Sequence, residues 1–274
     1  KSIKMFRILL ALFFINISFA QQIDKVDFIK CDALVAPNHS EKSISGTVTY
    51  EFKVKKAIDT IKIDAINMEF SEVLINGKSV KFKNSGKTLD LFEGYKKGKN
   101  KLTFNYSAKP KQTLYFTGQD ENLQIWTQGQ GRYTSHWLPS FDDVNEKVIF
   151  NVSVEFRNDF PVNSNGDFIS NKYNSKGNLI TWNYQMQKPM SSYLAMLAIG
   201  SFAKQTAITK SGTLLEFYLD KNDVSKFEPT YRYSKEMFDY LEKEIGVKYP
   251  WGIYRQVPVR DFLYAGMENT TSTI

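Results

Sequence analysis

An alternation of apolar and polar residues between positions 148 and 156 is the longest regular pattern in the sequence. The apolar positions of this pattern are Val148, Phe150, Val152, Val154 and Phe156. Successive side chains of a β-strand point to opposite faces of its sheet, so a period of two predicts a strand with one buried face. Such a strand needs neighbouring strands and a second layer to cover its apolar face.

Shorter segments with strand character precede and follow this one. Val48–Val54 alternates in the same way, and Asn76-Gly77 separates two apolar runs, which is typical of a type I′ hairpin turn. The run from Tyr193 to Ile199 is almost entirely apolar and predicts a strand covered on both faces. The 21 Phe and 15 Tyr residues add to this β character. We therefore expect a mostly β domain over residues 21–205, built as a large antiparallel sheet or sandwich.

The pattern changes in the last quarter of the chain. Leu214–Leu219 still predicts a strand, but from Pro229 to Ile245 the apolar residues recur at helical spacing. Gly246 follows at the position expected for a glycine that ends a helix. We therefore expect residues 206–274 to form the beginning of a second domain with both helices and strands.

The first twenty residues have the composition of a secretory signal peptide. Lys1, Lys4 and Arg7 precede an apolar run that ends at Ile15, and small residues occur up to Ala20. The apolar run is short for a membrane span, so an uncleaved anchor is the weaker alternative. We expect export to the periplasm, the cell envelope or the extracellular space, with no stable membrane span left after cleavage.

Charge and cysteine content argue against two kinds of site. Cleavage of residues 1–20 would remove three positive charges and no negative ones, so the formal charge of +7 would fall to +4. The remaining surplus is scattered, without an Arg-rich or glycine-aromatic motif, so we expect no nucleic-acid partner. Cys31 is the single cysteine, which excludes an intrachain disulfide and a cysteine-based zinc cluster in this chain.

Two polar segments have the clearest functional signature. The first is Trp126–Gln130, followed by Leu138–Asp143, and the second is Tyr264–Asn269. They resemble, in the same order, substrate-binding segments of the M1 family of zinc aminopeptidases, which includes aminopeptidase N and leukotriene A4 hydrolase-like members. The second segment is similar to the G-A/G-M-E-N motif of that family. By this resemblance, the substrate-binding residues are Gln128, Gln130, Tyr264, Ala265, Gly266, Met267, Glu268 and Asn269.

The resemblance implies that Glu268 and Gln130 bind the free α-amine of a peptide. This amine is mostly protonated at pH 7, because its pKa is near 8, and a carboxylate with a second oxygen acceptor can bind the ammonium. Burying a carboxylate without that partner costs free energy. The site would therefore reject peptides whose N-terminus is blocked, and residues in the interior of a chain. Many family members have Glu in place of Gln130, so this site has one negative charge less. Tyr264 is a candidate wall of the pocket for the first side chain.

The resemblance further implies a saddle-like β domain followed by a thermolysin-like catalytic domain. The family binds Zn²⁺ through an H-E-x-x-H helix, whereas His39 and His136, the two histidines here, lie outside any such motif. We therefore expect no metal ligands and no catalytic residues in this chain. It would be a fragment that ends before the zinc-binding helix and is inactive alone. The parent protein would be an exported zinc aminopeptidase that acts on peptides with free N-termini.

Other interpretations remain open from the sequence. The parent protein could be a family member that has lost catalysis and acts as a binding scaffold. The two segments could also match by chance in an unrelated secreted β-sandwich that binds a ligand. Gln130 alone raises a lesser variant, an aminopeptidase that is also an epoxide hydrolase. A zinc-binding motif after Ile274 would favour the enzyme over the scaffold and the unrelated module.

Overall fold

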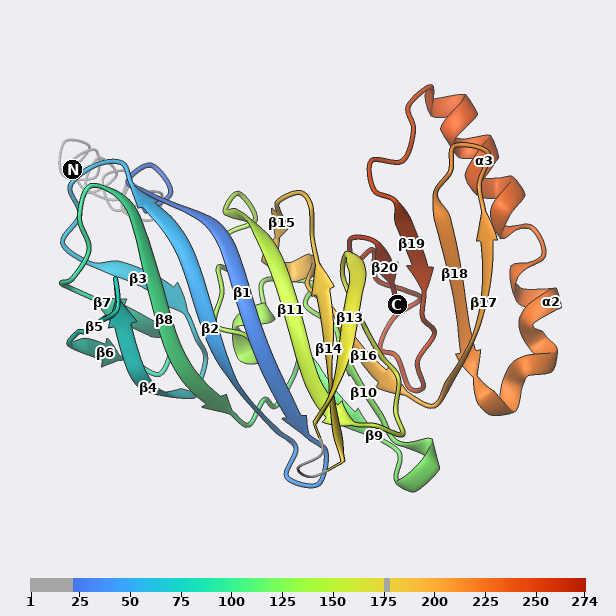
Figure 1. Cartoon of the computed structure of the whole chain (residues 1–274), viewed down its shortest axis with the longest axis horizontal. Helices are drawn as coiled ribbons and strands as arrows, with labels where there is room; N and C mark the ends of the chain where they lie inside the picture. The colour runs from blue at the N-terminus through green and yellow to red at the C-terminus, as the bar shows by residue number, and fades with distance from the viewer. Residues whose placement is uncertain (1–21, 175–177) are drawn as a thin grey trace, which may run out of the picture.

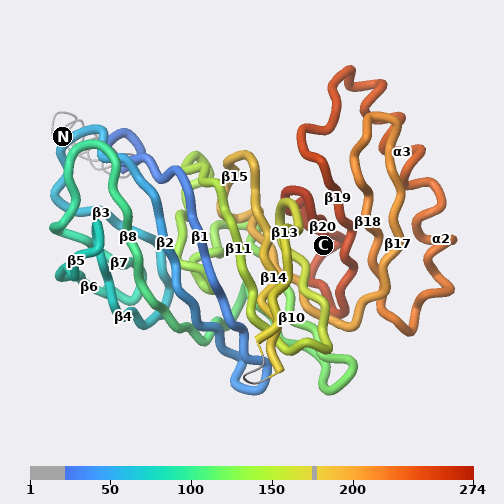
Figure 2. Tube along the Cα trace, viewed as in Figure 1, coloured from blue at the N-terminus to red at the C-terminus, as the bar shows by residue number. Residues whose placement is uncertain are grey.

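The computed structural model describes residues 22–174 and 178–274, and β-sheets make up most of it (Figure 1). The predicted signal peptide, residues 1–20, lies outside the described residues. Within these residues, no helix combines the length and the apolar character that crossing a membrane requires. The chain runs from a large sheet at the N-terminal end to a smaller sheet with helices at the C-terminal end, as the colours of Figure 2 show.

The large sheet has the strand order β13-β14-β11-β1-β2-β8-β4-β5, and β15 pairs with β11. Most of its neighbouring strands are antiparallel, as predicted, but β1 and β11 are parallel, with Lys30 beside Ile149. A parallel pair needs a long crossover, which local alternation does not encode. The strands of this mixed sheet are β1 (Val26–Asn38), β2 (Ser43–Val54), β4 (Met68–Ile75), β5 (Lys78–Ser79), β8 (Gly98–Ala108), β11 (Lys147–Arg157), β13 (Asp167–Asn174), β14 (Leu179–Gln185) and β15 (Met190–Ser191).

Two smaller sheets share an apolar core with the large sheet. Phe104 of the large sheet, Ile125 of one small sheet and Leu91 of the other belong to this core. The predicted sandwich is therefore confirmed. The first small sheet, in the order β12-β16-β10-β9, contains β9 (Leu114–Thr117), β10 (Gln124–Thr127), β12 (Val162–Ser164) and β16 (Leu197–Gly200). The second, in the order β3-β7-β6, contains β3 (Ile61–Asp64), β6 (Phe82–Asn84) and β7 (Thr88–Leu91).

Several local predictions are confirmed, and one is corrected. All five apolar residues of the 148–156 alternation are buried on β11. Asn76 and Gly77 both have positive φ, 53° and 78°, as a type I′ turn requires. The run Tyr193–Ile199 is not one strand, because Ser192–Leu194 forms the short 3₁₀ turn η4 and the strand begins only at Leu197.

The C-terminal sheet has the order β17-β18-β19-β20, and its helices cover one face through Leu215, Phe217 and Phe227. The predicted helix is interrupted at Arg232 and Tyr233, but its glycine cap is confirmed, with Gly246 at φ 74°. The elements are β17 (Phe202–Ile208), β18 (Leu214–Asp220), η5 (Lys221–Lys226), α2 (Phe227–Tyr231), α3 (Ser234–Ile245), β19 (Ile253–Gln256) and β20 (Ser272–Thr273). The predicted division after residue 205 falls inside β17 and stays a prediction.

The other face of the C-terminal sheet packs against β10 and β16. Trp126, Ala198 and Tyr218 belong to this second apolar cluster. The sheet that contains β10 and β16 is therefore enclosed between the large sheet and the C-terminal sheet. This explains why every residue of β10 and β16 is buried, as the apolar run before Gly200 predicts. It also places the end of β10 beside the C-terminal part of the chain.

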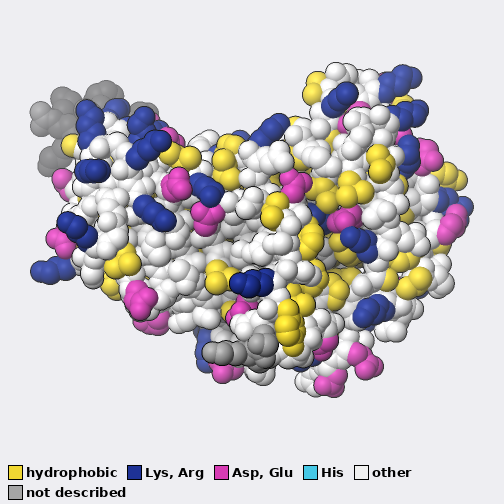
Figure 3. Space-filling model, viewed as in Figure 1, with side chains coloured by type: hydrophobic (Ala, Val, Ile, Leu, Met, Phe, Trp, Pro, Cys, Tyr) yellow, Lys and Arg dark blue, Asp and Glu magenta, His cyan; other side chains and the backbone are white. Residues whose placement is uncertain are grey.

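Charged side chains are dispersed over the face of the molecule in Figure 3. Side chains of both signs occur across this face, with Lys and Arg side chains most frequent at its upper left and upper right. This distribution agrees with the scattered surplus charge of the sequence. The absence of a nucleic-acid partner stays a prediction.

Candidate functional site

The first predicted segment lies where the chain leaves β10. Its backbone is anchored by the Gln128 N–H, which donates to the Thr113 carbonyl at 2.8 Å. Gln128 is 5% exposed, whereas Gln130 is exposed in a turn whose next residue, Gly131, has φ 87°. The two glutamines therefore face different environments: Gln128 points into the protein and Gln130 reaches solvent.

The second predicted segment alternates between buried and exposed residues. Met267 and Asn269 are 1% and 2% exposed, whereas Glu268 between them is exposed. The segment is held by a pair of backbone hydrogen bonds, in which Met267 N donates to Ile274 O at 2.7 Å and Ile274 N donates to Met267 O at 3.2 Å. With its neighbours fixed in this way, Glu268 presents its carboxylate on the surface.

The buried amide of Gln128 joins the two segments. Its Nε2 atom lies 3.4 Å from Gln130 Oε1 and 3.9 Å from Met267 Sδ, on a residue 139 positions away in the chain. Met267 is the immediate neighbour of Glu268. The structure thus brings Gln130 and Glu268 to the same region, as the proposed pairing of the two segments requires.

The remaining predicted residues lie on the surface next to this junction. Tyr264 is 63% exposed, and Ala265 and Gly266 are also exposed. A Cβ atom on Gly266 would lie 3.3 Å from Ile274 O, so the backbone strands are close there. The expected part of Tyr264 as a pocket wall stays a prediction.

The turn η4 lies between the two segments and contacts both. From the first side, Ser192 Oγ donates to the Phe141 carbonyl, and Thr134 Oγ1, between the two parts of the first segment, donates to Ser192 O at 3.0 Å. From the second side, Asn269 Nδ2 donates to Leu194 O at 3.2 Å. Burial raises the pKa of the hydroxyl of Tyr193, the middle residue of η4, and the nearby Glu268 carboxylate raises it further.

Tyr193 is the residue of this site that the sequence did not reveal. The apolar run from Tyr193 to Ile199 predicts a strand that includes Tyr193. The small polar residues Ser191 and Ser192 before it are the one local sign that the strand starts later. The following residue, Leu194, contacts Asn269, which is 75 positions away in the chain, so only the folded chain shows that η4 lies beside the second segment.

A buried ion pair lies beneath the C-terminal sheet. Arg255, 1% exposed, donates from Nε to Glu216 Oε2 at 2.8 Å and from Nη1 to Gly166 O at 2.6 Å. Lys204 Nζ also donates to Glu216, at 2.7 Å from Oε1. Burial acts to raise the pKa of Glu216, but the hydrogen bonds and charges of Lys204 and Arg255 lower it overall. Glu216 is therefore ionised at neutral pH, and Arg255 bridges it to the loop before β13.

The described residues do not form a metal centre. No group of three or more His, Cys, Asp or Glu side chains in residues 22–174 and 178–274 could hold a metal ion. His39 Nε2 lies 3.1 Å from Thr117 O, and His136 Nε2 accepts from Gln112 Nε2 at 3.0 Å. Burial lowers the pKa of His136. The Zn²⁺ that the family resemblance implies thus finds no ligand set in the part of the chain described here.

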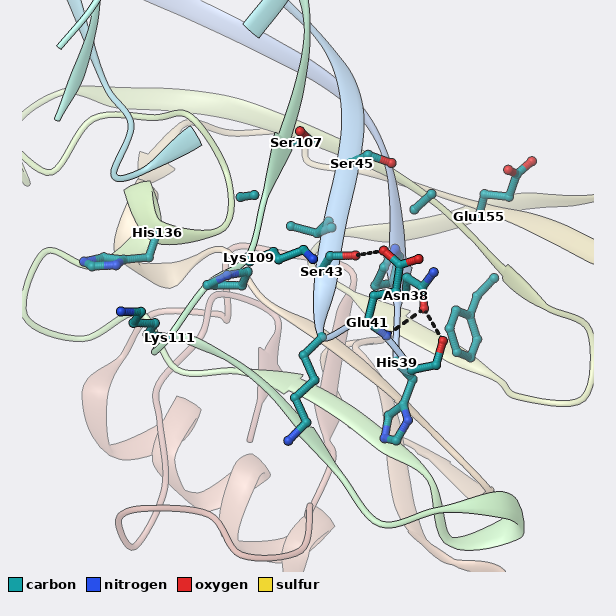
Figure 4. A pocket seen from close by; sticks show the side chains of 18 of the residues that line it. Asn38, His39, Glu41, Ser43, Ser45, Ser107, Lys109, Lys111, His136 and Glu155 are labelled. Atoms are coloured by element: carbon teal, nitrogen blue, oxygen red, sulfur yellow. Dashed lines mark hydrogen bonds between the residues drawn. The ribbon is translucent and has the colours of Figure 1, made fainter. Parts of the chain in front are cut away.

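A large groove of about 1570 Å³ lies elsewhere, between the turn that joins β1 to β2 and the chain after β8. Figure 4 shows Asn38 and Glu41 from this turn, and Lys109, Lys111 and His136 on the other side. Asn38 Oδ1 accepts hydrogen bonds from Ser40 Oγ and Glu41 N, which fixes the turn. Among the described residues that line the groove, none is a predicted substrate-binding residue.

The chain is similar to aminopeptidases over most of its length. It is 25% identical to the probable aminopeptidase 1 of Sulfurisphaera tokodaii over 226 residues, 80% of this chain and 28% of that protein. It is 24% identical to the puromycin-sensitive aminopeptidase of Caenorhabditis elegans over 253 residues, 86% of this chain and 27% of that protein. A shorter match, 28% identical over 135 residues, covers 48% of this chain and 14% of the glutamyl aminopeptidase of Bos taurus. The chain thus spans about a quarter of the length of the first two relatives.

The family of the chain follows from its β domain. Residues 30–194, more than half of the chain, match the Peptidase M1 N-terminal domain, and this range includes Gln128, Gln130 and Tyr193. The match overturns the alternative of an unrelated β-sandwich. The chain belongs to the family defined by the Peptidase M1 N-terminal domain.

Proposed function

We propose that this chain is the N-terminal part of a zinc aminopeptidase that removes N-terminal residues from peptides, and that Glu268 and Gln130 bind the free α-amine. The observation that carries this proposal is the double contact of the Gln128 amide, with Gln130 Oε1 and with Met267 Sδ. It supports the proposal because it connects the Gln130 side-chain oxygen to Met267, the residue next to Glu268. The aminopeptidase names of the relatives support the reaction class.

The exposed positions of this site suit an extended peptide. Glu268 and Gln130 are exposed, so a ligand ammonium can reach both without a change in the buried residues between them. A carboxylate accepts charge-assisted hydrogen bonds from an ammonium, and a neutral amide oxygen adds a further acceptor. The small exposed residues Ala265 and Gly266 leave room for the ligand backbone. This chain would thus hold the N-terminal amine of the peptide, and so it would select the peptide bond after the first residue for cleavage.

The metal chemistry would come from parts of the parent protein other than this chain. The described residues offer no three-residue ligand set, so none of them is assigned a part in bond cleavage. Zn²⁺ supplies a Lewis acid and an activated water in enzymes of this kind. The basic and apolar start of the sequence supports export of the parent protein, to the periplasm, the cell envelope or the extracellular space.

The amine-binding part of the proposal is testable with the 274-residue chain. Leucinamide has a free α-amine, whereas N-acetyl-leucinamide does not, and both can be titrated while amide NMR signals are recorded. We expect leucinamide to bind weakly, with a Kd of about 1 mM or above, which corresponds to about 4 kcal/mol or less, because an exposed charge pair contributes only about 1 kcal/mol and the ligand is small. Binding of the acetylated compound should be at least about tenfold weaker, in line with about 1.4 kcal/mol or more for the lost charge.

A matched pair of variants identifies the carboxylate. Glu268→Ala should abolish the preference for leucinamide, and Glu121→Ala, at an exposed glutamate on another surface, should retain it. Equal binding of both compounds to the unchanged chain would contradict the proposal. In the parent protein, Glu268→Ala should lower kcat/KM by about 30- to 5,000-fold, which corresponds to about 2–5 kcal/mol.

The non-catalytic scaffold remains the alternative for the parent protein. It predicts the same preference for free amines but no turnover of leucine p-nitroanilide by the parent protein with zinc. The 274-residue chain alone should show no turnover in either case. Aminopeptidase activity of this chain that a chelator removes would contradict the assignment of the metal ligands to other parts of the protein.

A further inference from the structure

Helix α3 is attached to the C-terminal sheet by a narrow face that is largely polar. Phe238 packs against the Tyr254 ring, with the ring centroids 5.7 Å apart. Glu242 Oε1 accepts hydrogen bonds from Tyr249 N at 2.7 Å and from Ser211 Oγ at 3.0 Å. No residue of α3 is fully buried by these contacts. A helix that covers a sheet ordinarily turns its widest apolar stripe toward that sheet, and α3 does not.

The opposite side of α3 is apolar and open to solvent. Its apolar residues recur three and four positions apart, so they are neighbours on one side of the helix. Each of them is between 53% and 67% exposed, and a hollow of about 400 Å³ lies among them. We call this surface the outer face of α3. Together with one residue before the helix and one after it, its apolar members are Tyr233, Met237, Tyr240, Leu241, Ile245 and Val247.

The outer face lies at the outside of the layered molecule. In Figure 1, α3 is on the side of the C-terminal sheet that faces away from the large sheet. The other side of the C-terminal sheet is already packed against β10 and β16, through Trp126 and Tyr218. A contiguous exposed apolar patch marks an interaction surface, whereas single exposed apolar residues do not. The outer face thus has the composition of a buried surface, yet it is uncovered in the part of the chain that the structure describes.

We propose that the outer face of α3 is the docking surface for the part of the parent protein that follows Ile274. The proposal rests on that part of the proposed function which makes this chain the N-terminal part of a longer protein. The matched regions make up 28% and 27% of the first two relatives, so about three quarters of each relative lies outside them. Ile274 directly follows β20, the edge strand of the sheet that α3 covers. A continuing chain would therefore start beside the layer that carries the outer face.

The charges of the outer face specify what docks there. Glu236 and Glu244 are exposed and lie among its apolar residues, one turn from Tyr240 on either side. A carboxylate that becomes buried needs a cation or hydrogen-bond donors, so the docking segment should be apolar with a Lys, an Arg or a helix N-terminus opposite these glutamates. A second copy of this chain, docked by the same face, would instead bring like charges together, which is unfavourable.

Cysteine labelling tests the docking. Leu241→Cys places a thiol on the outer face, whereas the natural Cys31 is buried and its pKa is raised to about 12, so it does not compete in the folded protein. We expect a maleimide to label Leu241→Cys at least about 30-fold more slowly in the parent protein than in the 274-residue chain. Lys83→Cys, at an exposed position of β6, is the control and should react at the same rate in both. Equal rates for Leu241→Cys would overturn the proposal.

A second variant and a second occupant are covered by the same measurement. If Leu241→Cys does not fold, as its far-UV circular dichroism would show, Tyr240→Cys replaces it on the same face. Protection of the thiol in the 274-residue chain itself, increasing with the concentration of the chain, would identify a second copy as the occupant and would overturn the proposal.

Stability gives an independent test of the docking. Leu241→Lys should leave the urea midpoint of the 274-residue chain unchanged, because the side chain is more than half exposed there. In the parent protein the same substitution should accelerate hydrogen exchange of α3 by at least about tenfold, because a lysine would be buried in the docked face. Unchanged exchange in the parent protein would contradict the docking.

The docking and the amine site fail in different ways. Labelling of Leu241→Cys requires no ligand, so it reports the docking even if the unchanged chain does not prefer leucinamide. In that case the proposed amine site fails and the docking stands. If leucinamide is preferred but Leu241→Cys reacts equally in both proteins, the docking alone fails.

Discussion

Two carboxyl groups beside the large sheet, Glu146 and Asp142, link the stability of the fold to pH. Glu146 is 5% exposed, and its Oε1 accepts a hydrogen bond from Phe28 N at 3.0 Å. Burial raises the pKa of Glu146 to about 7, although the Phe28 bond acts in the opposite direction. Burial also raises the pKa of Asp142, to about 6, even though Ser135 Oγ donates to it at 2.6 Å. Both groups are harder to ionise in the folded chain than in the unfolded chain.

We predict that the free energy of unfolding decreases as the pH rises from about 4.5 to above 7. The folded chain binds more protons than the unfolded chain in this range, so stability is complete below the unfolded pKa and is lost as pH passes the folded pKa. Glu146 should account for up to about 3 kcal/mol. Urea unfolding between pH 4.5 and 8 measures this, and Glu146→Gln should flatten the curve while Glu121→Gln does not. Parallel curves for all three proteins would contradict it.

At the scale of residues, the sequence predicted motif members but not their contacts. Glu268 and Gln130 belong to recognisable segments, and the structure places these segments together. Tyr193 has no motif of its own, and only the folded chain places its turn, η4, beside Gly129 of the first segment and Asn269 of the second. The bond between Glu146 and Phe28 joins residues 118 positions apart, so no local pattern could indicate it.

Among the elements, the chain between β10 and η3 (Thr134–His136) depends on one close backbone approach. A Cβ atom on Gly129 would lie 2.7 Å from Tyr193 O and 2.9 Å from Thr134 Oγ1. Distances below 3.0 Å to a backbone oxygen cannot be relieved by a rotamer change alone. Glycine is therefore required at position 129 because there is no space for a side chain. The backbone conformation does not itself require glycine, since φ is not in the left-handed region.

We predict that Gly129→Ala separates the first segment from η4. The overpacking should cost about 1–3 kcal/mol of stability and weaken leucinamide binding, because Gln128 and Gln130 move with the segment. Thermal unfolding and the amide NMR signals of Gln128 and Met267 measure the two effects. Gly252→Ala is the control, since nothing lies within 4 Å of its Cβ position and its φ is not positive. Equal effects of the two substitutions would argue against a special part of Gly129.

Local patterns predicted elements well where neighbours in sequence decide the conformation. The alternation of β11, the Asn76-Gly77 turn and the Gly246 cap are of this kind. The same approach failed at Tyr193, because an apolar run does not say where a turn ends and a strand begins. It also missed the parallel pairing of β1 with β11, which is set by the path of the whole chain.

The whole molecule is held together at one end by the buried Arg255. This side chain reaches from β19 to Glu216 on β18 and to the carbonyl of Gly166 in the loop before β13. It also lies over the Tyr184 ring, 5.3 Å from its centre. The C-terminal sheet is thereby joined to the edge of the large sheet by a charge that has no access to water.

We predict that Arg255→Met lowers the free energy of unfolding by about 3–5 kcal/mol, because it leaves Glu216 without its buried partner. Arg157→Met, at an exposed pair with Asp159, should cost less than about 1 kcal/mol. Urea unfolding measures both. Hydrogen exchange should accelerate around Gly166 in Arg255→Met and stay unchanged there in Arg157→Met. A small and equal loss in both variants would show that Arg255 contributes only packing.

The layered arrangement was only partly predictable at this scale. A β-sandwich followed by a mixed region follows from composition and periodicity. The packing of the C-terminal sheet against β10 and β16 depends on Trp126, Ala198 and Tyr218, which alternation alone assigns to no particular partner. The division of the chain into domains after residue 205 likewise stays a prediction.

The joining of Gln128 with Met267 also has a consequence for the order in which the protein forms during translation. The two residues are 139 positions apart. At about 5–20 residues per second, a ribosome needs roughly 7–28 seconds to pass from one to the other. All strands of the large sheet precede Met267 in the sequence, so this sheet can pair while the second segment is still to be synthesised. The junction of the two segments can form only after Met267 and Ile274 have left the exit tunnel.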